Sequence, residues 1–251
     1  MLNYLKKMKS NQKYFLGCSG WYYNDWAGNF YPEKLSKSRW LEYYSKQFNT
    51  VEINNTFYRF PNEKTVKGWY NKTPDNFKLT LKANQVITHR RRFKNTQSTL
   101  NRFYSLAEIL NEKLGCILFQ IPPQKSKDID FLKNAVNQFD LSKNNIIEFR
   151  HPSWYNDEVY DLLNKSEVGF CSVSSADLPD DLVITANITY IRFHGVGSEK
   201  YHYLYSDKEL KKWANKLKES DSDQVFCYFN NDYNANAPKN AQMLQKMTNS
   251  P

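Results

Sequence analysis

Short apolar runs alternate along the chain with segments in which apolar residues recur every three to four positions. The short runs have the length and the period of two that are typical of β-strands. The longer segments place apolar side chains on one face of a helix, as Trp40, Tyr44 and Phe48 do. We therefore predict strands at residues 14–18, 50–54, 77–82, 116–120, 146–150, 168–173, 189–194 and 225–230. Helices are predicted at residues 36–48, 63–71, 96–110, 128–139, 157–165, 207–219 and 237–247.

This regular alternation over 251 residues predicts an α/β protein, a single (β/α)8 TIM-type barrel. No linker rich in Pro, Gly or Ser divides the chain. We expect one barrel domain at residues 14–251, preceded by an N-terminal extension at residues 1–13. An open doubly wound sheet is the alternative, but it usually has a GxGxxG first turn, which GCSGW at residues 17–21 does not match.

Strand alternation sorts the residues of such a barrel into two faces. Apolar residues such as Val51, Ile53 and Phe193 occupy the positions that face the helices. The inward positions near the ends of the strands are polar: Glu52, Asn54, Lys78, Lys82, Gln120, Glu148, Arg150, Arg192, His194 and Asn230. Most lie at C-terminal strand ends, where barrel enzymes hold their active sites. We expect these groups to converge there, either as an active site or as an internal ion-pair network.

Seven segments carry a resemblance to a known family. They are GCSGWYYNDWAGNFYP, VEINNTFYRFP, Thr88-His89, LFQIPP, IEFRHPSW, RFHG and YFNND, in this order. Together they resemble the YecE-like family, the proteins of domain of unknown function 72, from about Tyr14 to Leu244. The resemblance implies a TIM barrel, and it implies no particular reaction. The basic loop at residues 90–92 departs from the family pattern.

Glu52, Glu148 and His194 are the predicted catalytic residues. A carboxylate among apolar strand residues is costly to bury unless it is paired, ligated or used. Two carboxylates facing each other across a barrel can act as acid and base, or as nucleophile and acid. With Asp232, the same three side chains could instead ligate a divalent metal. We predict no metal ligands and no cofactor, and we leave a divalent metal open.

Basic groups outnumber acidic groups in the predicted interior, so we expect a phosphate or carboxylate group of a small ligand to bind there. Gly195 follows the seventh strand, where barrels often bind phosphate through backbone N–H groups. The predicted substrate-binding residues are Asn54, Lys82, His89, Gln120, Arg150, Arg192, Gly195, Asn230, Trp21 and Tyr58.

Aromatic residues from three predicted loops could ring the same mouth, namely Trp21, Tyr22, Tyr23, Trp26, Phe30, Tyr31, Trp154, Tyr155, Tyr201 and Tyr203. Such rings stack on sugars or bases, or they pack together as the core of a loop. We predict an enzyme that performs acid/base chemistry on a small anionic substrate, phosphorylated or carbohydrate-like, with hydrolase, lyase and isomerase chemistry all open. The alternative is a nucleic-acid-binding or metal-dependent phosphodiester-processing barrel that uses the basic loop at residues 90–92.

The net charge of +9 permits an anionic ligand or nucleic acid as partner and requires neither. The four cysteines are scattered without metal-site spacing, so we expect buried, reduced thiols in a cytoplasmic protein. No apolar run is long enough to cross a bilayer, and we expect no membrane partner. The sequence leaves the oligomeric state open.

Overall fold

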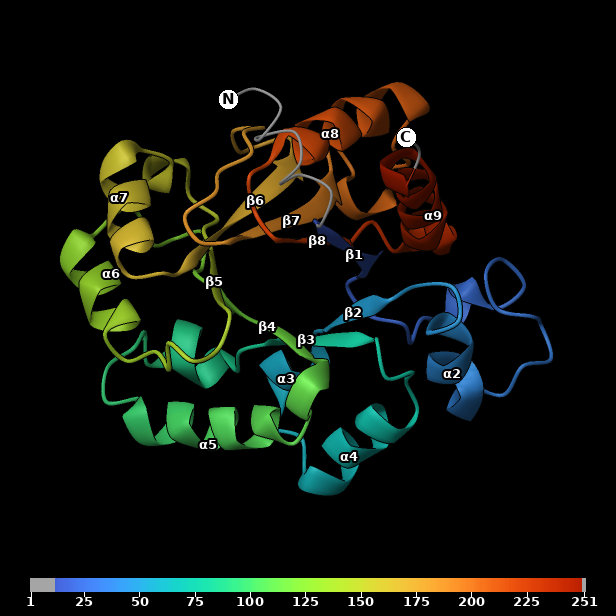
Figure 1. The fold of residues 1–251 in the computed structure, drawn as a ribbon, viewed down its shortest axis with the longest axis horizontal. Coiled ribbons are helices and arrows are strands. Elements are labelled where there is room, and N and C mark those ends of the chain that lie inside the picture. The colour runs from blue at the N-terminus through green and yellow to red at the C-terminus, as the bar shows by residue number, and fades with distance from the viewer. Residues whose placement is uncertain (1–11, 250–251) are drawn as a thin grey trace.

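The computed structural model describes residues 12–249. Eight parallel strands form one sheet in the order β1-β8-β7-β6-β5-β4-β3-β2, which curves into a nearly closed barrel (Figure 1). The predicted (β/α)8 fold is thus confirmed. The strands are β1 (Lys13–Cys18), β2 (Thr50–Ile53), β3 (Lys78–Lys82), β4 (Leu114–Gln120), β5 (Asn145–Glu148), β6 (Gly169–Ser175), β7 (Ile188–Gly195) and β8 (Gln224–Phe229).

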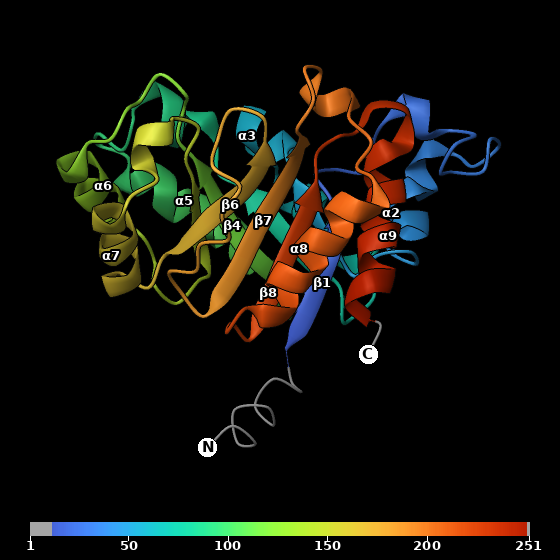
Figure 2. The same ribbon diagram turned by 90° about the horizontal axis from the view of Figure 1, so that it is seen from above.

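Helices surround the strands on the outside of the barrel (Figures 1 and 2). The α-helices are α2 (Trp40–Tyr44), α3 (Asn55–Tyr58), α4 (Glu63–Asn71), α5 (Gln97–Glu108), α6 (Ile129–Val136), α7 (Asp157–Lys165), α8 (Asp207–Glu219) and α9 (Asn236–Asn249). Single turns of 3-10 helix are η2 (Asn24–Trp26), η3 (Lys37–Arg39), η5 (Asn111–Lys113), η6 (Pro152–Trp154), η7 (Lys200–His202) and η8 (Tyr233–Ala235). A π-helix, η4 (Val86–Arg90), follows β3.

Three helices, α4, α7 and α8, begin and end at the predicted residues. Each begins after a side chain that accepts a hydrogen bond from a backbone N–H of the first turn: Asn62, Asn156 and Ser206. Ser206 and Glu209 form a complete capping box. The helix predicted at residues 36–48 is shorter at both ends, because its first part is the 3-10 turn η3 and α2 ends at Tyr44. Helix α3 and the π-helix η4 were not predicted.

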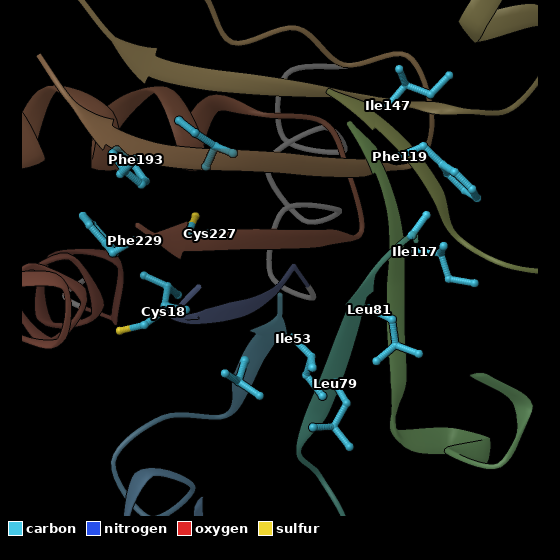
Figure 3. Close-up of a cluster of buried hydrophobic side chains, with 14 of the residues drawn as sticks. Cys18, Ile53, Leu79, Leu81, Ile117, Phe119, Ile147, Phe193, Cys227 and Phe229 are labelled. Atoms are coloured by element: carbon cyan, nitrogen blue, oxygen red, sulfur yellow. The ribbon is translucent and has the colours of Figure 1, made fainter. Parts of the chain in front are cut away.

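The main apolar core lies between the strands and the helices. Outward-facing side chains from strands around the barrel build it, among them Ile53, Leu81, Phe119 and Phe229 (Figure 3). All four are at most 1% exposed. Burial of this set supplies the main driving force for closing the layer of helices over the sheet.

The interior of the barrel is apolar in its N-terminal half and polar in its C-terminal half. Phe15, Cys116, Ile146 and Phe226 belong to a second buried cluster, which fills the N-terminal half. Lys78, predicted to add its charge to the site, lies at the N-terminal end of β3, and its ammonium donates to the backbone carbonyl of Glu112. That prediction was wrong, because inward parity does not distinguish the two ends of a strand.

One seam of the barrel lacks a backbone ladder, because β1 and β2 are the two ends of the hydrogen-bonded strand order. The hydroxyl of Tyr44 lies in this seam. It accepts from the backbone N–H of Cys18 at 2.7 Å and donates to the carbonyl of Thr50 at 3.0 Å. Gly17 leaves the space for it, since a Cβ there would lie 2.7 Å from this hydroxyl and 2.2 Å from the Thr50 carbonyl oxygen. The side chain of Asn49 also joins the seam, because it accepts from the backbone N–H of Leu16 and donates to the carbonyl of Tyr14. Tyr44 and Asn49 thus replace the missing strand pairing.

The substitution Tyr44→Phe is expected to destabilise the protein by about 2–3 kcal/mol. It removes the partner of two buried backbone groups and leaves both unsatisfied. Urea unfolding monitored by circular dichroism measures the change. Tyr43→Phe is the matched control, since Tyr43 lies on the same helix and is only partly buried; equal stability losses in the two variants would contradict the role of the Tyr44 hydroxyl.

Lys13, which was predicted to belong to the N-terminal extension, is the first residue of β1. The rest of that extension, apart from Gln12, lies outside the described residues. Each of the four cysteines is buried and free of disulfide bonds. Across residues 12–249, no helix is both long enough and apolar enough to span a bilayer.

Candidate active site

Arg192 lies at the centre of a buried charge cluster in the C-terminal half of the barrel. Its two terminal nitrogens contact two carboxylates from other strands. Nη2 is 2.6 Å from Oε1 of Glu52, and Nη1 is 2.7 Å from Oε2 of Glu148. All three side chains are at most 1% exposed. The guanidinium fork therefore bridges both predicted catalytic carboxylates.

Each carboxylate has further partners. Tyr190 donates its hydroxyl to Oε2 of Glu52 at 2.6 Å. Oε1 of Glu148 lies 2.6 Å from Nε of Arg150, as an ion pair without the geometry of a hydrogen bond. Burial alone would raise the pKa of Glu148, but Arg150 and Arg192 outweigh it and hold this pKa well below its usual range. Glu148 is thus an anion in the folded protein.

His194 is a neutral imidazole between two polar partners. Its Nε2 lies 3.0 Å from Oε1 of Glu148, and the side-chain amide of Asn230 lies 3.1 Å from its Nδ1. Burial, together with the charge of Arg150, lowers the pKa of His194 to about 3. With Asn230 donating to Nδ1, the proton lies on Nε2 and is donated to Glu148.

A pocket of about 810 Å³ opens above this cluster. Residues at or just after the C-terminal end of every strand line it: Tyr23, Asn54, Lys82, Gln120, Arg150, Ser175, Arg192 and Asn230. It is therefore the C-terminal mouth of the barrel. Its volume suits a small molecule rather than a folded partner.

Lys82 is the cation of the pocket floor that has no carboxylate partner: none of the ion pairs formed within residues 12–249 involves it. Its ammonium lies 4.4 Å from the centre of the Phe57 ring. Burial, and then the positive charge of Arg192, lower the pKa of Lys82 to about 8. The pKa of His89 is also lowered, first by burial and then by the positive charges of Lys82 and Arg92.

Three hydrogen bonds place these groups. Thr56 on α3 donates its hydroxyl to the carbonyl of Lys82 at 2.7 Å, which brings Phe57 over the end of β3. Asn84 donates to the carbonyl of Thr56 at 2.9 Å and accepts from the backbone N–H of Val86 at 3.0 Å. The start of η4, and with it His89, is thereby fixed to α3.

The comparison with known families identifies the family to which the chain belongs. The sequence model described as "Protein of unknown function DUF72" matches residues 15–251. This chain belongs to the DUF72 family. The resemblance predicted from the seven motifs is thus confirmed.

Three relatives match along nearly their whole length. The chain is 29% identical to the UPF0759 protein YunF of Bacillus subtilis, over 92% of this chain and 93% of that protein. It superposes with a TM-score of 0.87 on the crystal structure of a DUF72 family protein from Thermotoga maritima, at 29% identity, covering 95% of this chain and 100% of that one. A DUF72 family protein from Enterococcus faecalis, 19% identical, gives a TM-score of 0.82 and covers 95% and 96% of the two chains.

In this DUF72 chain, the predicted convergence of Glu52, Lys82, Glu148, Arg150, Arg192 and His194 at one end of the barrel is confirmed. The predicted substrate-binding residues that line the pocket are Asn54, Tyr58, Lys82, His89, Gln120, Arg150, Arg192 and Asn230. Glu52, Glu148 and His194 lie beneath them and have no exposed surface. Their catalytic role stays a prediction.

Gly195 does not offer its backbone to the pocket, contrary to the prediction. Its N–H donates to the hydroxyl of Tyr205 at 2.8 Å. Glycine is required there because φ is +94° and a Cβ would lie 1.9 Å from the carbonyl oxygen of Lys200. The glycine at this position is structurally required, but the requirement comes from a tight turn and not from an anion-binding site.

Trp21 likewise lies outside the pocket lining. It packs edge-on against Trp69, with ring centres 6.4 Å apart. Trp26 and Tyr31 of the same loop are buried. Most of the aromatic loop is therefore a packed loop core, and Tyr23 is the member of it that lines the pocket. Tyr58 of α3 and Tyr201 of η7 line the pocket as well.

The metal alternative required Glu52, Glu148, His194 and Asp232 to meet. Within residues 12–249, no three His, Cys, Asp or Glu side chains form a group that could hold a metal ion. The Arg192 guanidinium occupies the space between the two glutamates.

Further pocket residues lie on loops and short helices that no strand pattern indicates, among them Phe57, Gln85, Asp177, Leu178 and Lys200. Their common signal is position, since each follows the C-terminal end of a strand. Asp232, which had been considered only as a metal ligand, also lines the pocket; burial raises its pKa, and Asp25 adds to the effect.

Proposed function

We propose that the protein is an enzyme that performs acid/base chemistry on a small anionic substrate at the C-terminal mouth of the barrel. The observation that carries the proposal is the Lys82 ammonium. Arg150 and Arg192 are paired with the two buried glutamates, whereas the Lys82 ammonium on the pocket floor forms no ion pair within residues 12–249. Charge-assisted hydrogen bonds from such a group favour a carboxylate, phosphate or sulfate.

Three side chains of the pocket are suited to moving protons. Lys82, His89 and Asp232 all line it, and the pKa of each is shifted from its ordinary value. Shifted groups of this kind, gathered in one pocket, are typical of acid/base sites. Glu52 and Glu148 support the site from below by holding Arg150 and Arg192, and His194 donates to Glu148.

Sulfate is expected to raise the melting temperature more than chloride does at equal ionic strength, because an anion that binds only the folded state stabilises it. The stabilisation should weaken above about pH 8, where Lys82 loses its proton. Thermal unfolding with sulfate between pH 6.5 and pH 9 measures both effects, since sulfate itself does not titrate there.

Lys82→Met should abolish this stabilisation. Lys200→Met is the matched control, because Lys200 lines the same pocket but forms an ion pair with Asp177. Equal loss in both variants, or no stabilisation of the unsubstituted protein, would contradict the proposal. Stabilisation by oligonucleotides alone, lost at moderate salt, would instead favour a nucleic-acid-binding surface at the exposed residues 90–92.

A further inference from the structure

We propose that Lys82 is a covalent Schiff-base residue, and that the substrate is a small anion with an aldehyde or ketone group beside its carboxylate or phosphate. This inference rests on the proposed function, because it assigns the chemistry of the same pocket. Three features carry it: the placement of the amine, the cations beside it, and the proton-transfer groups around it.

The amine of Lys82 is placed as a nucleophile would be. It lies on the pocket floor, close to the face of Phe57, and no carboxylate holds it as an ammonium. Lysines become nucleophilic when they are desolvated or lie next to another cation, and here both conditions hold. With a pKa of about 8, roughly a tenth of the side chain is neutral at pH 7, against far less than a hundredth for an ordinary lysine.

The neighbouring cations explain why the carbonyl compound should be an anion. Arg150 extends into the pocket with 16% of its side chain exposed and uses Nε for its ion pair with Glu148. Its terminal nitrogens are not engaged in that contact, so they can bind a carboxylate or phosphate. Gln120 and Asn230 line the same floor and offer amide donors. An anion held there brings its carbonyl carbon next to the amine.

The reaction balances without an oxidant or reductant. The neutral nitrogen of Lys82 attacks the carbonyl carbon, a C–N bond forms, and the carbonyl oxygen becomes a hydroxyl after proton transfer. The C–O bond then breaks, the oxygen leaves as water with an added proton, and a protonated imine remains. His89 and Asp232 line the pocket and can accept and supply these protons.

Reductive trapping tests the inference. The purified full-length protein is incubated with pyruvate or glyoxylate and sodium cyanoborohydride, and modified lysines are located by peptide mass spectrometry. We expect Lys82 to be modified at least about tenfold faster than any other lysine. Sulfate should protect it by competition, and the neutral ketone acetone should react more slowly than pyruvate.

Lys82→Met and Lys82→Arg should both lose the fast adduct, whereas Lys200→Met should keep it. Mapping on the unsubstituted protein gives the answer even if one variant fails to fold. Modification spread evenly over the lysines would overturn the inference. If sulfate still stabilises the protein through Lys82 but no adduct forms there, the inference fails and the proposed function stands; if sulfate also has no effect, both fail.

Discussion

Replacing Arg192 with methionine is expected to destabilise the protein by about 3–5 kcal/mol or more, since removal of one partner leaves buried charges uncompensated. A loss of this size is a large part of the whole stability of a domain. Glu148 would keep Arg150 and His194 as partners, but Glu52 would keep, among the described residues 12–249, only the hydroxyl of Tyr190. Urea unfolding and thermal melting measure the loss.

A double variant separates the uncompensated charge from lost packing. Glu52→Gln combined with Arg192→Met removes the orphaned carboxylate and should recover part of the stability that Arg192→Met loses. Glu52→Gln alone should cost less than Arg192→Met, because glutamine has the same shape and can still accept from Arg192. If the double variant is as unstable as the sum of the two single variants, the charge explanation is wrong.

The fold followed from the sequence because its signals are local. Period-two alternation around Val51 and Ile53, and side-chain caps at Asn62, Asn156 and Ser206, act within a few residues. The seam between β1 and β2 had no such signal. The seam depends on hydrogen bonds of the Tyr44 hydroxyl with Cys18 of β1, which precedes Tyr44 in the chain, and with Thr50 of β2, which follows it. It also depends on the space left by Gly17.

The sequence predicted which residues gather at the site, but it did not predict which of them pair with one another. Parity placed Glu52, Glu148 and Arg192 at the same end of the barrel, and the structure brings them there. Which cation pairs with which carboxylate depends on the curvature of the sheet and on side-chain length. The sequence was therefore consistent with two hypotheses, an internal ion-pair network and an active site. The structure contains the network, and above it lies the partly buried Lys82, a pocket cation without a carboxylate partner within residues 12–249.

The stability of the protein is expected to fall steeply as the pH is lowered from 6.5 to 4.5, with His194 as the main cause. Its pKa is about 3 in the folded protein, against 6.5 ordinarily, so between these values the unfolded chain binds a proton that the folded protein does not. Stability therefore rises with pH across this window, by up to about 1.4 kcal/mol per pH unit for one such group. Glu148, whose pKa is also depressed, adds a loss of the same sign below pH 4.5.

The substitution His194→Gln isolates this contribution. Glutamine offers an amide donor to Glu148 and has no proton to gain, so the slope of unfolding free energy against pH should flatten between pH 6.5 and 4.5, whatever the stability at neutral pH. His89→Gln is the matched control: the pKa of His89 is lowered as well, but this side chain is only partly buried and should change the slope less. Asp232 does not mimic the effect. Its pKa is raised in the folded protein, so its protonation favours the folded state as the pH falls. An unchanged slope in His194→Gln would show that the buried imidazole is not the group that titrates, and the neutral state assigned to it beside Glu148 would have to be abandoned.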